Sequence, residues 1–235
     1  MSLIDFHRPM RRTDVAPVLR PWLVWGAGAG VYVLAVFHRS SLGVAGPEAQ
    51  ARLGLTATQL SLFVMLQLGM YAAMQVPTGI MVDRFGPRRM LLAATLVMGS
   101  AQLLFAFVHT YPLALLARGL LGVGDAMTYI SVLRLAAGWF PARHYPVITA
   151  LTGLLGTCGN LIATLPLTAL LHNVGWTVTF AGAGALSLAY TLVLIRKSTA
   201  KVTVHPTLCS NAVSGSVAIR LPQVPSRPVN AVITG

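Results

Sequence analysis

The chain has 235 residues, of which 55% are hydrophobic and only 9% are charged, and it carries a formal net charge of +12. A typical soluble domain has about 25% charged residues, so this chain cannot cover a globule with polar surface and its solvent must be mostly lipid. The 17 Lys and Arg residues lie beside long apolar runs rather than on one basic face with aromatic residues, which argues against binding to nucleic acid.

Six apolar segments are each long enough to cross a hydrocarbon core of about 30 Å as a helix, which takes roughly 20 residues. Their apolar runs are too uniform for barrel strands, and only helices or closed barrels satisfy their own backbone in lipid. In chain order the segments cover residues 22–45, 60–82, 90–108, 112–135, 147–171 and 174–195. The sequence therefore predicts an all-α membrane protein, with a bundle of six transmembrane helices over residues 21–195.

Basic residues distinguish the two sides of this bundle. With a cytoplasmic N-terminus, the outer connections hold only Arg52, and the positive-inside bias then places both termini in the cytoplasm of a cell with the bundle in its inner or plasma membrane. The first segment lacks a small-residue cleavage site, so we expect an uncleaved span. The residues expected on the cytoplasmic side are Arg8, Arg11, Arg12, Arg20, Arg84, Arg88, Arg89, Arg143, Arg196, Lys197 and Lys201.

Four ionisable residues fall within the spans, namely His38 and Arg39 in the first and Arg118 and Asp125 in the fourth. Such residues are costly in a membrane and indicate function. Arg118 and Asp125 are seven residues apart, so they share one helix face within about 20° but lie about 10.5 Å apart along the axis. We predict a polar column in which Arg118 contacts an anionic group and Asp125 takes part in proton coupling. A structural charge network inside the bundle is the alternative.

The connection between the second and third spans, "GIMVDRFGPRR" at residues 79–89, concentrates charge in one short turn. Its pattern resembles the signature loop of the major facilitator superfamily. Glycine permits tight turning, and the positive-inside bias holds the arginines in the cytoplasm. A merely basic anchor would not explain the acid between two glycines, so we predict a conformational gating loop. The matching residues are Gly79, Asp83, Arg84, Gly86, Arg88 and Arg89.

The resemblance continues in "LARGLLGVGDA" at residues 116–126, which is similar to the fourth-helix pattern of the family, and more loosely in "LTGLLGTCGN" at residues 151–160. It covers residues 20–195 and implies the N-terminal half of a twelve-helix architecture. Organic-anion symporters of this family carry an acid followed by arginine in the first helix. Here His38 replaces the acid, and the resemblance implies Arg39 as an anion contact. His38 is either a titrating group in proton coupling or a hydrogen-bonded helix histidine.

Other polar residues in the spans are candidates for the solute site. Tyr71 and Gln75, four residues apart in the second span, and Asn160 in the fifth could face a cavity or form interhelical hydrogen bonds. Arg134 lies near the cytoplasmic end of the fourth span, and we predict that it pairs with Asp83 or snorkels.

These observations predict a secondary active transporter that moves a small anionic organic solute, coupled to protons. The alternative is a non-transporting membrane interaction or regulatory protein that retains the scaffold. The sequence shows no enzyme constellation and no spacing for a metal, and it implies no cofactor. The expected partners are the lipid bilayer and the solute, together with a second six-helix half or a second copy of this chain.

Residues 196–235 are rich in Pro, Ser, Thr and Val and contain no run long enough to span a membrane. We expect this cytoplasmic tail to be largely disordered, as we expect residues 1–20 to form a cytoplasmic N-terminal segment. Three interpretations stay open: a truncated product of a transporter gene, a half that pairs with itself or a partner, and a complete small membrane protein with another role. We favour the first.

Overall fold

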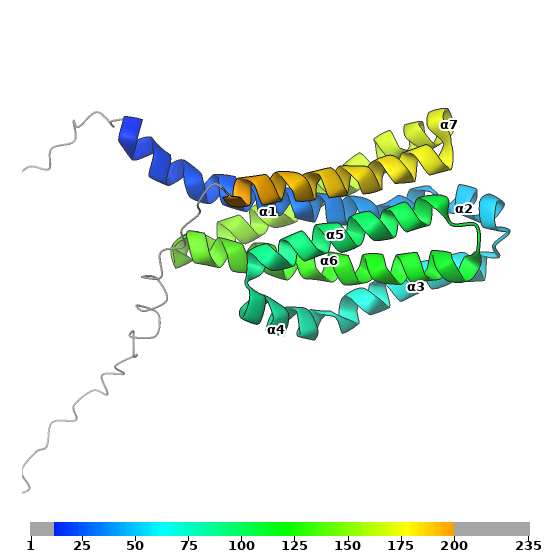
Figure 1. The fold of residues 1–235 in the computed structure, drawn as a ribbon, viewed down its shortest axis with the longest axis horizontal. Coiled ribbons are helices and arrows are strands. Elements are labelled where there is room, and N and C mark those ends of the chain that lie inside the picture. The colour runs from blue at the N-terminus through cyan, green and yellow to red at the C-terminus, as the bar shows by residue number, and fades with distance from the viewer. Residues whose placement is uncertain (1–11, 200–235) are drawn as a thin grey trace, which may run out of the picture. The chain divides into compact units, whose positions relative to one another are not determined.

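The computed structural model describes residues 12–199, without the side chains of residues 12–19, 165 and 197–199. The predicted tail beyond residue 199 and the first eleven residues lie outside this description. Within it the chain forms helices and no strand, which confirms the all-α fold class. The elements are α1 (Arg12–Val44), α2 (Gly46–Leu53), α3 (Ala57–Ala73), α4 (Gln75–Phe85), α5 (Pro87–Phe107), α6 (Tyr111–Trp139), the short 3-10 helix η1 (Ala142–His144) and α7 (Tyr145–Thr199) (Figure 1).

Five helical segments of the described chain are long and apolar enough to cross a membrane. They cover Arg20–Val44, Pro87–Phe107, Tyr111–Trp139, Ala142–Thr164 and Pro166–Arg196. The number becomes six if α2 and α3, which meet at 118°, are taken as one broken span. Helix α1 begins at Arg12, ten residues before the first predicted span, so part of the expected N-terminal segment is helical.

The predicted second span, residues 60–82, is not one continuous helix. It is divided between α3, which ends at Ala73, and α4, which begins at Gln75. Pro77 explains the break, because proline has no N–H to donate and its ring crowds the carbonyl four residues earlier, which is that of Ala73. Tyr71 and Gln75 therefore lie in two separate helices rather than one turn apart in a single helix.

Helix α7 is interrupted at Gly175, where φ is 80°. Glycine reaches this left-handed region without a steric penalty. Residues on both sides of it contact the same stretch of α1: Trp25 Nε1 donates to Thr152 Oγ1 at 3.2 Å, and Tyr190 Oη donates to the carbonyl of Ala27 at 2.9 Å. The chain therefore reverses at Gly175, which is close to the boundary predicted between the fifth and sixth spans.

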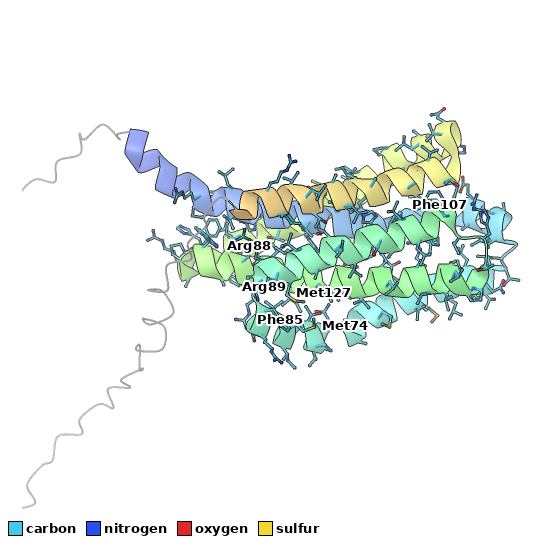
Figure 2. All side chains as sticks on the ribbon, viewed as in Figure 1. Met74, Phe85, Arg88, Arg89, Phe107 and Met127 are labelled. Carbon is cyan, nitrogen blue, oxygen red and sulfur yellow. The ribbon has the colours of Figure 1, made fainter. Side chains whose placement is uncertain are left out.

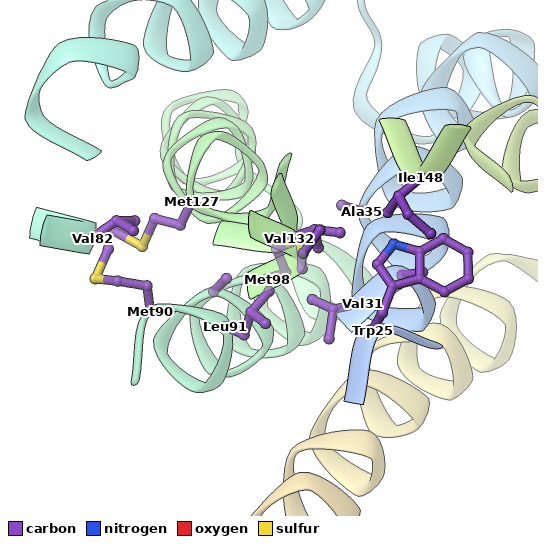
Figure 3. Close-up of a cluster of buried hydrophobic side chains, with 13 residues drawn as sticks. Trp25, Val31, Ala35, Val82, Met90, Leu91, Met98, Met127, Val132 and Ile148 are labelled. Atoms are coloured by element: carbon purple, nitrogen blue, oxygen red, sulfur yellow. The ribbon is translucent and has the colours of Figure 1, made fainter. Parts of the chain in front are cut away.

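Two clusters of buried apolar side chains stabilise the bundle. In one of them, Val82, Met90 and Met127 converge from α4, α5 and α6, while Trp25 and Ile148 lie on its other side (Figure 3). The second cluster is aromatic, with Phe63, Phe105, Trp176 and Phe180 among its members. Many large apolar side chains remain exposed, including those of Leu23, Met65, Val76, Leu154 and Leu192, as expected of a surface that faces lipid.

A polar layer separates the two apolar clusters. On each of three helices, the buried residues of one cluster are separated from those of the other by a stretch that belongs to neither. These stretches are residues 36–41 of α1, 99–104 of α5 and 118–126 of α6. They bring charged and polar side chains to the same level of the bundle, inside the protein. The buried polar residues in these stretches are His38, Ser41, Gln102, Arg118 and Asp125.

Candidate functional site

Arg39 of α1 and Asp125 of α6 form an ion pair in the polar layer. Arg39 Nε lies 2.6 Å from Asp125 Oδ2, and Arg39 Nη2 lies 2.7 Å from Oδ1, so the pair is bidentate. The Arg39 side chain is 29% exposed, whereas that of Asp125 is 1% exposed. A bidentate guanidinium–carboxylate pair fixes the geometry of both groups, and here its guanidinium side stays accessible.

Tyr71 of α3 completes this part of the site. The Arg39 guanidinium carbon lies 4.7 Å from the centroid of the Tyr71 ring, which is within the range of a cation–π contact. The structure thus brings together three residues that the sequence suggested separately, from α1, α3 and α6. Gln75 does not share the helix of Tyr71, because it lies beyond the break, at the first residue of α4.

Arg118 has different surroundings. Its side chain is fully buried, and its guanidinium carbon lies 3.9 Å from the centroid of the Phe105 ring. Nε, Nη1 and Nη2 of Arg118 have no hydrogen-bond partner among the described residues. Arg118 and Asp125 share the inner side of α6, but Asp125 pairs across to α1 rather than along its own helix.

The other two predicted residues of the spans form links between helices. His38 is fully buried, and its Nε2 lies 2.6 Å from the hydroxyl of Ser187 in α7. Ser40 donates a hydrogen bond to the side-chain oxygen of Asn160, also in α7. Neither bond could be read from the sequence, because Ser187 was one serine in an apolar run. Both attach α1 to α7 on either side of Arg39.

Sequence reasoning missed Gln102 of α5. This side chain is fully buried, and both its amide nitrogen and its amide oxygen lack hydrogen-bond partners among the described residues. The signal was present, since a glutamine within a predicted span is a polar group in apolar surroundings. Its position relative to the charged residues depends on how α5 packs against α6 and α7.

The predicted gating loop is a tight turn between α4 and α5. Gly86 joins the two helices with φ 82° and ψ 152°, a conformation that favours glycine. Asp83 pairs with Arg134 of α6, which confirms the pairing expected between them. Arg88 and Arg89 lie exposed at the start of α5, beside the end of α4 (Figure 2). The turn at Gly86 thus joins α4 to α5, and the ion pair of Asp83 next to it links α4 to α6.

We expect Asp83→Asn to lower the free energy of unfolding by less than about 1 kcal/mol, because the side chains of the pair are 55% and 58% exposed and such pairs contribute little. Denaturant unfolding of the purified chain in detergent measures this change. Arg84→Gln, at the neighbouring exposed position, is the matched control. A loss above about 2 kcal/mol would show that the pair is a principal structural link between α4 and α6.

The described residues contain no group of three or more His, Cys, Asp or Glu side chains that could hold a metal ion. The fold and the site instead define a helical integral membrane protein with charged groups inside its bundle. The family model of the Major Facilitator Superfamily matches residues 28–216, and the chain belongs to this superfamily. This membership in the superfamily agrees with the resemblance of residues 79–89 to the signature loop of the superfamily.

Several curated relatives that the chain resembles are named as transporters. The chain is 29% identical over 171 residues to the probable sulfoacetate transporter SauU of Cupriavidus necator, covering 73% of this chain and 40% of the relative. It is 26% identical to the uncharacterized transporter YybO of Bacillus subtilis, covering 73% and 39%. It is 27% identical to the probable L-galactonate transporter of Escherichia coli, covering 66% and 34%. The chain thus matches about two fifths or less of the length of these relatives.

Proposed function

We propose that this chain forms the N-terminal six-helix part of a secondary transporter, which moves a small organic anion together with protons. The observation that carries this proposal is the ion pair between Arg39 and Asp125. A guanidinium within a span that is 29% exposed is available to a solute, and its counter-charge is a carboxylate that is almost fully buried. Intramembrane charges of this kind mark solute and proton pathways.

The geometry of the pair suggests how the proton and the anion are coupled. Asp125 occupies the Nε and Nη2 donors of Arg39, and these are the donors that a solute carboxylate would take. Protonation of Asp125 removes its charge and frees the guanidinium for the solute. When the solute leaves, Asp125 loses its proton and pairs with Arg39 again, so one proton and one anionic group move together.

The names of two relatives support an anionic solute, since sulfoacetate and L-galactonate both carry a carboxylate. In this proposal Arg39 binds the anionic group and Tyr71 holds the guanidinium by its ring. Asn160 and Gln75 are further candidates for contacts with the solute. His38 is a second candidate for proton coupling, although its hydrogen bond to Ser187 suits a role in holding α1 against α7.

Transport by alternating access requires two units that rock about a site at their interface. We propose that the partner unit is a second six-helix half or a second copy of this chain, and that both termini face the cytoplasm. The link between Asp83 and Arg134 would open and close with this motion, because it joins α4 to α6 next to the glycine turn. Gly79 and Gly86 would permit the hinge, and Arg84, Arg88 and Arg89 would keep it at the cytoplasmic surface.

Uptake by the purified full chain in proteoliposomes tests the proposal, with labelled sulfoacetate and L-galactonate as probes and an inward proton gradient. We expect accumulation that follows the gradient, and Arg39→Gln should reduce it at least about tenfold, since a charged hydrogen-bonding partner of the solute is lost. Asp125→Asn should retain exchange of labelled for unlabelled solute but lose accumulation driven by protons.

Arg143→Gln, in the exposed η1, serves as the control for general loss of charge. A binding assay in detergent accompanies the uptake, because binding to Arg39 does not require the rocking motion. If neither probe binds saturably and Arg39→Gln changes nothing, the non-transporting interaction protein becomes the better account of the chain.

A further inference from the structure

The proposed transport mechanism does not use the second intramembrane arginine, Arg118. The charge of this side chain has no partner in the described part of the bundle. The ion pairs of the described residues join Arg39 to Asp125 and Arg134 to Asp83. Arg118 is fully buried, and its three nitrogen atoms find no acceptor among the side chains and backbone groups that the structure describes. A buried charge without a partner is strongly unfavourable, so the native bundle must compensate it.

Contact with Phe105 compensates this charge only in part. The ring faces the guanidinium at 3.9 Å from its centroid, and a desolvated cation–π contact is favourable. A ring, however, accepts no strong hydrogen bond in the plane of the guanidinium, where the N–H groups of arginine point. These donors therefore still require an acceptor that brings negative charge.

Two further buried side chains of the polar layer, those of Gln102 and His38, have donors without partners among the described residues. Gln102 precedes Phe105 by three residues on α5, so both side chains lie on one face of that helix, and its amide nitrogen is buried and unpaired. His38 of α1 lies in the same polar layer, and its Nδ1 is also buried without a partner. When Ser187 donates to Nε2 of His38, Nδ1 carries the proton and is a donor.

We propose that Arg118, Gln102 and His38 form an internal binding site for a small monovalent inorganic anion such as chloride. One guanidinium supplies one positive charge, which a monovalent ion balances. A halide is less strongly hydrated than sulfate or phosphate, and the Phe105 ring against Arg118 is apolar and buried.

This site is separate from the one at Arg39. Arg39 is partly exposed and already paired, whereas Arg118 is enclosed between the two apolar clusters. The bound halide would be a resident of the folded bundle and not the transported solute. It would stabilise the chain by mass action, because the unfolded chain does not assemble the three donors.

Equilibrium binding of radiolabelled chloride to the purified full chain in detergent tests this site. We expect saturable binding that bromide displaces and sulfate does not. Arg118→Gln should abolish binding, and Gln102→Leu should weaken it about tenfold, as expected when one hydrogen bond to a charged group is lost. The melting temperature should rise with the chloride concentration at constant ionic strength, and this rise should disappear in Arg118→Gln.

Absence of saturable chloride binding in the wild-type chain would overturn the proposal and leave internal water as the acceptor. Loss of binding in Arg39→Gln with retention in Arg118→Gln would also overturn it, because chloride would then occupy the organic-anion site. If gel filtration shows that Arg118→Gln does not fold, Gln102→Leu decides: unchanged affinity contradicts the site and weakened affinity supports it. Since organic-anion uptake depends on Arg39 and not on chloride binding, either proposal can fail alone.

Discussion

Asp125→Leu is expected to lower the free energy of unfolding by about 3 kcal/mol. The substitution leaves the guanidinium of Arg39 inside the bundle without its carboxylate, and breaking one side of a buried pair costs about 3–5 kcal/mol. We expect the lower end of this range because the Arg39 side chain is 29% exposed and its guanidinium can recover some hydration. Unfolding of the purified chain in detergent, followed by circular dichroism, measures the change.

The double variant Arg39→Met/Asp125→Leu separates loss of the pair from loss of packing. Replacement of both charges by apolar groups is often close to neutral, so the double variant should recover most of the stability that Asp125→Leu loses. The coupling energy of the resulting cycle should therefore be large. Additive effects of the two substitutions would show that the pair contributes to stability only through independent packing.

Gly122→Ala is expected to destabilise the chain by about 1–3 kcal/mol, which is the usual range for overpacking. A methyl group at Gly122 of α6 would lie 2.3 Å from the backbone oxygen of Gln67 in α3. Because this neighbour is backbone, α3 and α6 must move apart to admit it. Small residues at such crossings are what permits close approach of helices in membranes.

Gly138→Ala is the matched control, on the same helix but with no atom within 4 Å of the added methyl group. Alanine favours the helix over glycine by up to about 1 kcal/mol, so this variant should be unchanged or slightly more stable. Thermal unfolding of both variants in the same detergent measures the contrast. Equal effects at the two positions would contradict the close packing of α3 against α6.

Local signals in the sequence sufficed to predict the helices and the ionisable residues inside them. The apolar runs are long, and each is bounded by charge, proline or glycine, so the fold class followed from composition and length alone. The break at Met74 could also have been anticipated, since Pro77 lies in the sequence. It was missed because hydropathy averages over a window and ignores one absent N–H group.

The pairing of distant charges was predicted only in part: the pair of Arg134 with Asp83 was expected, whereas the pair of Arg39 with Asp125 was not. Arg39 and Asp125 are 86 positions apart, and nothing in the sequence indicated that Asp125 pairs with a residue of the first span. Gln102 attracted no attention, because a single glutamine hardly changes the hydropathy of a span. Gln102 lies one helical turn from Phe105 on α5. It becomes significant because the packing of α5 against α6 brings the Phe105 ring to Arg118.

The sequence by itself determined that this chain is a helical membrane protein, that its turn at residues 79–89 follows the pattern of its superfamily, and that charges lie within its spans. Only the tertiary structure decided which of those charges is paired and partly exposed, at Arg39, and which is enclosed without a partner, at Arg118. The reason is physical: hydropathy and helix formation depend on neighbours along the chain, whereas the energy of a buried charge depends on groups brought near it by packing.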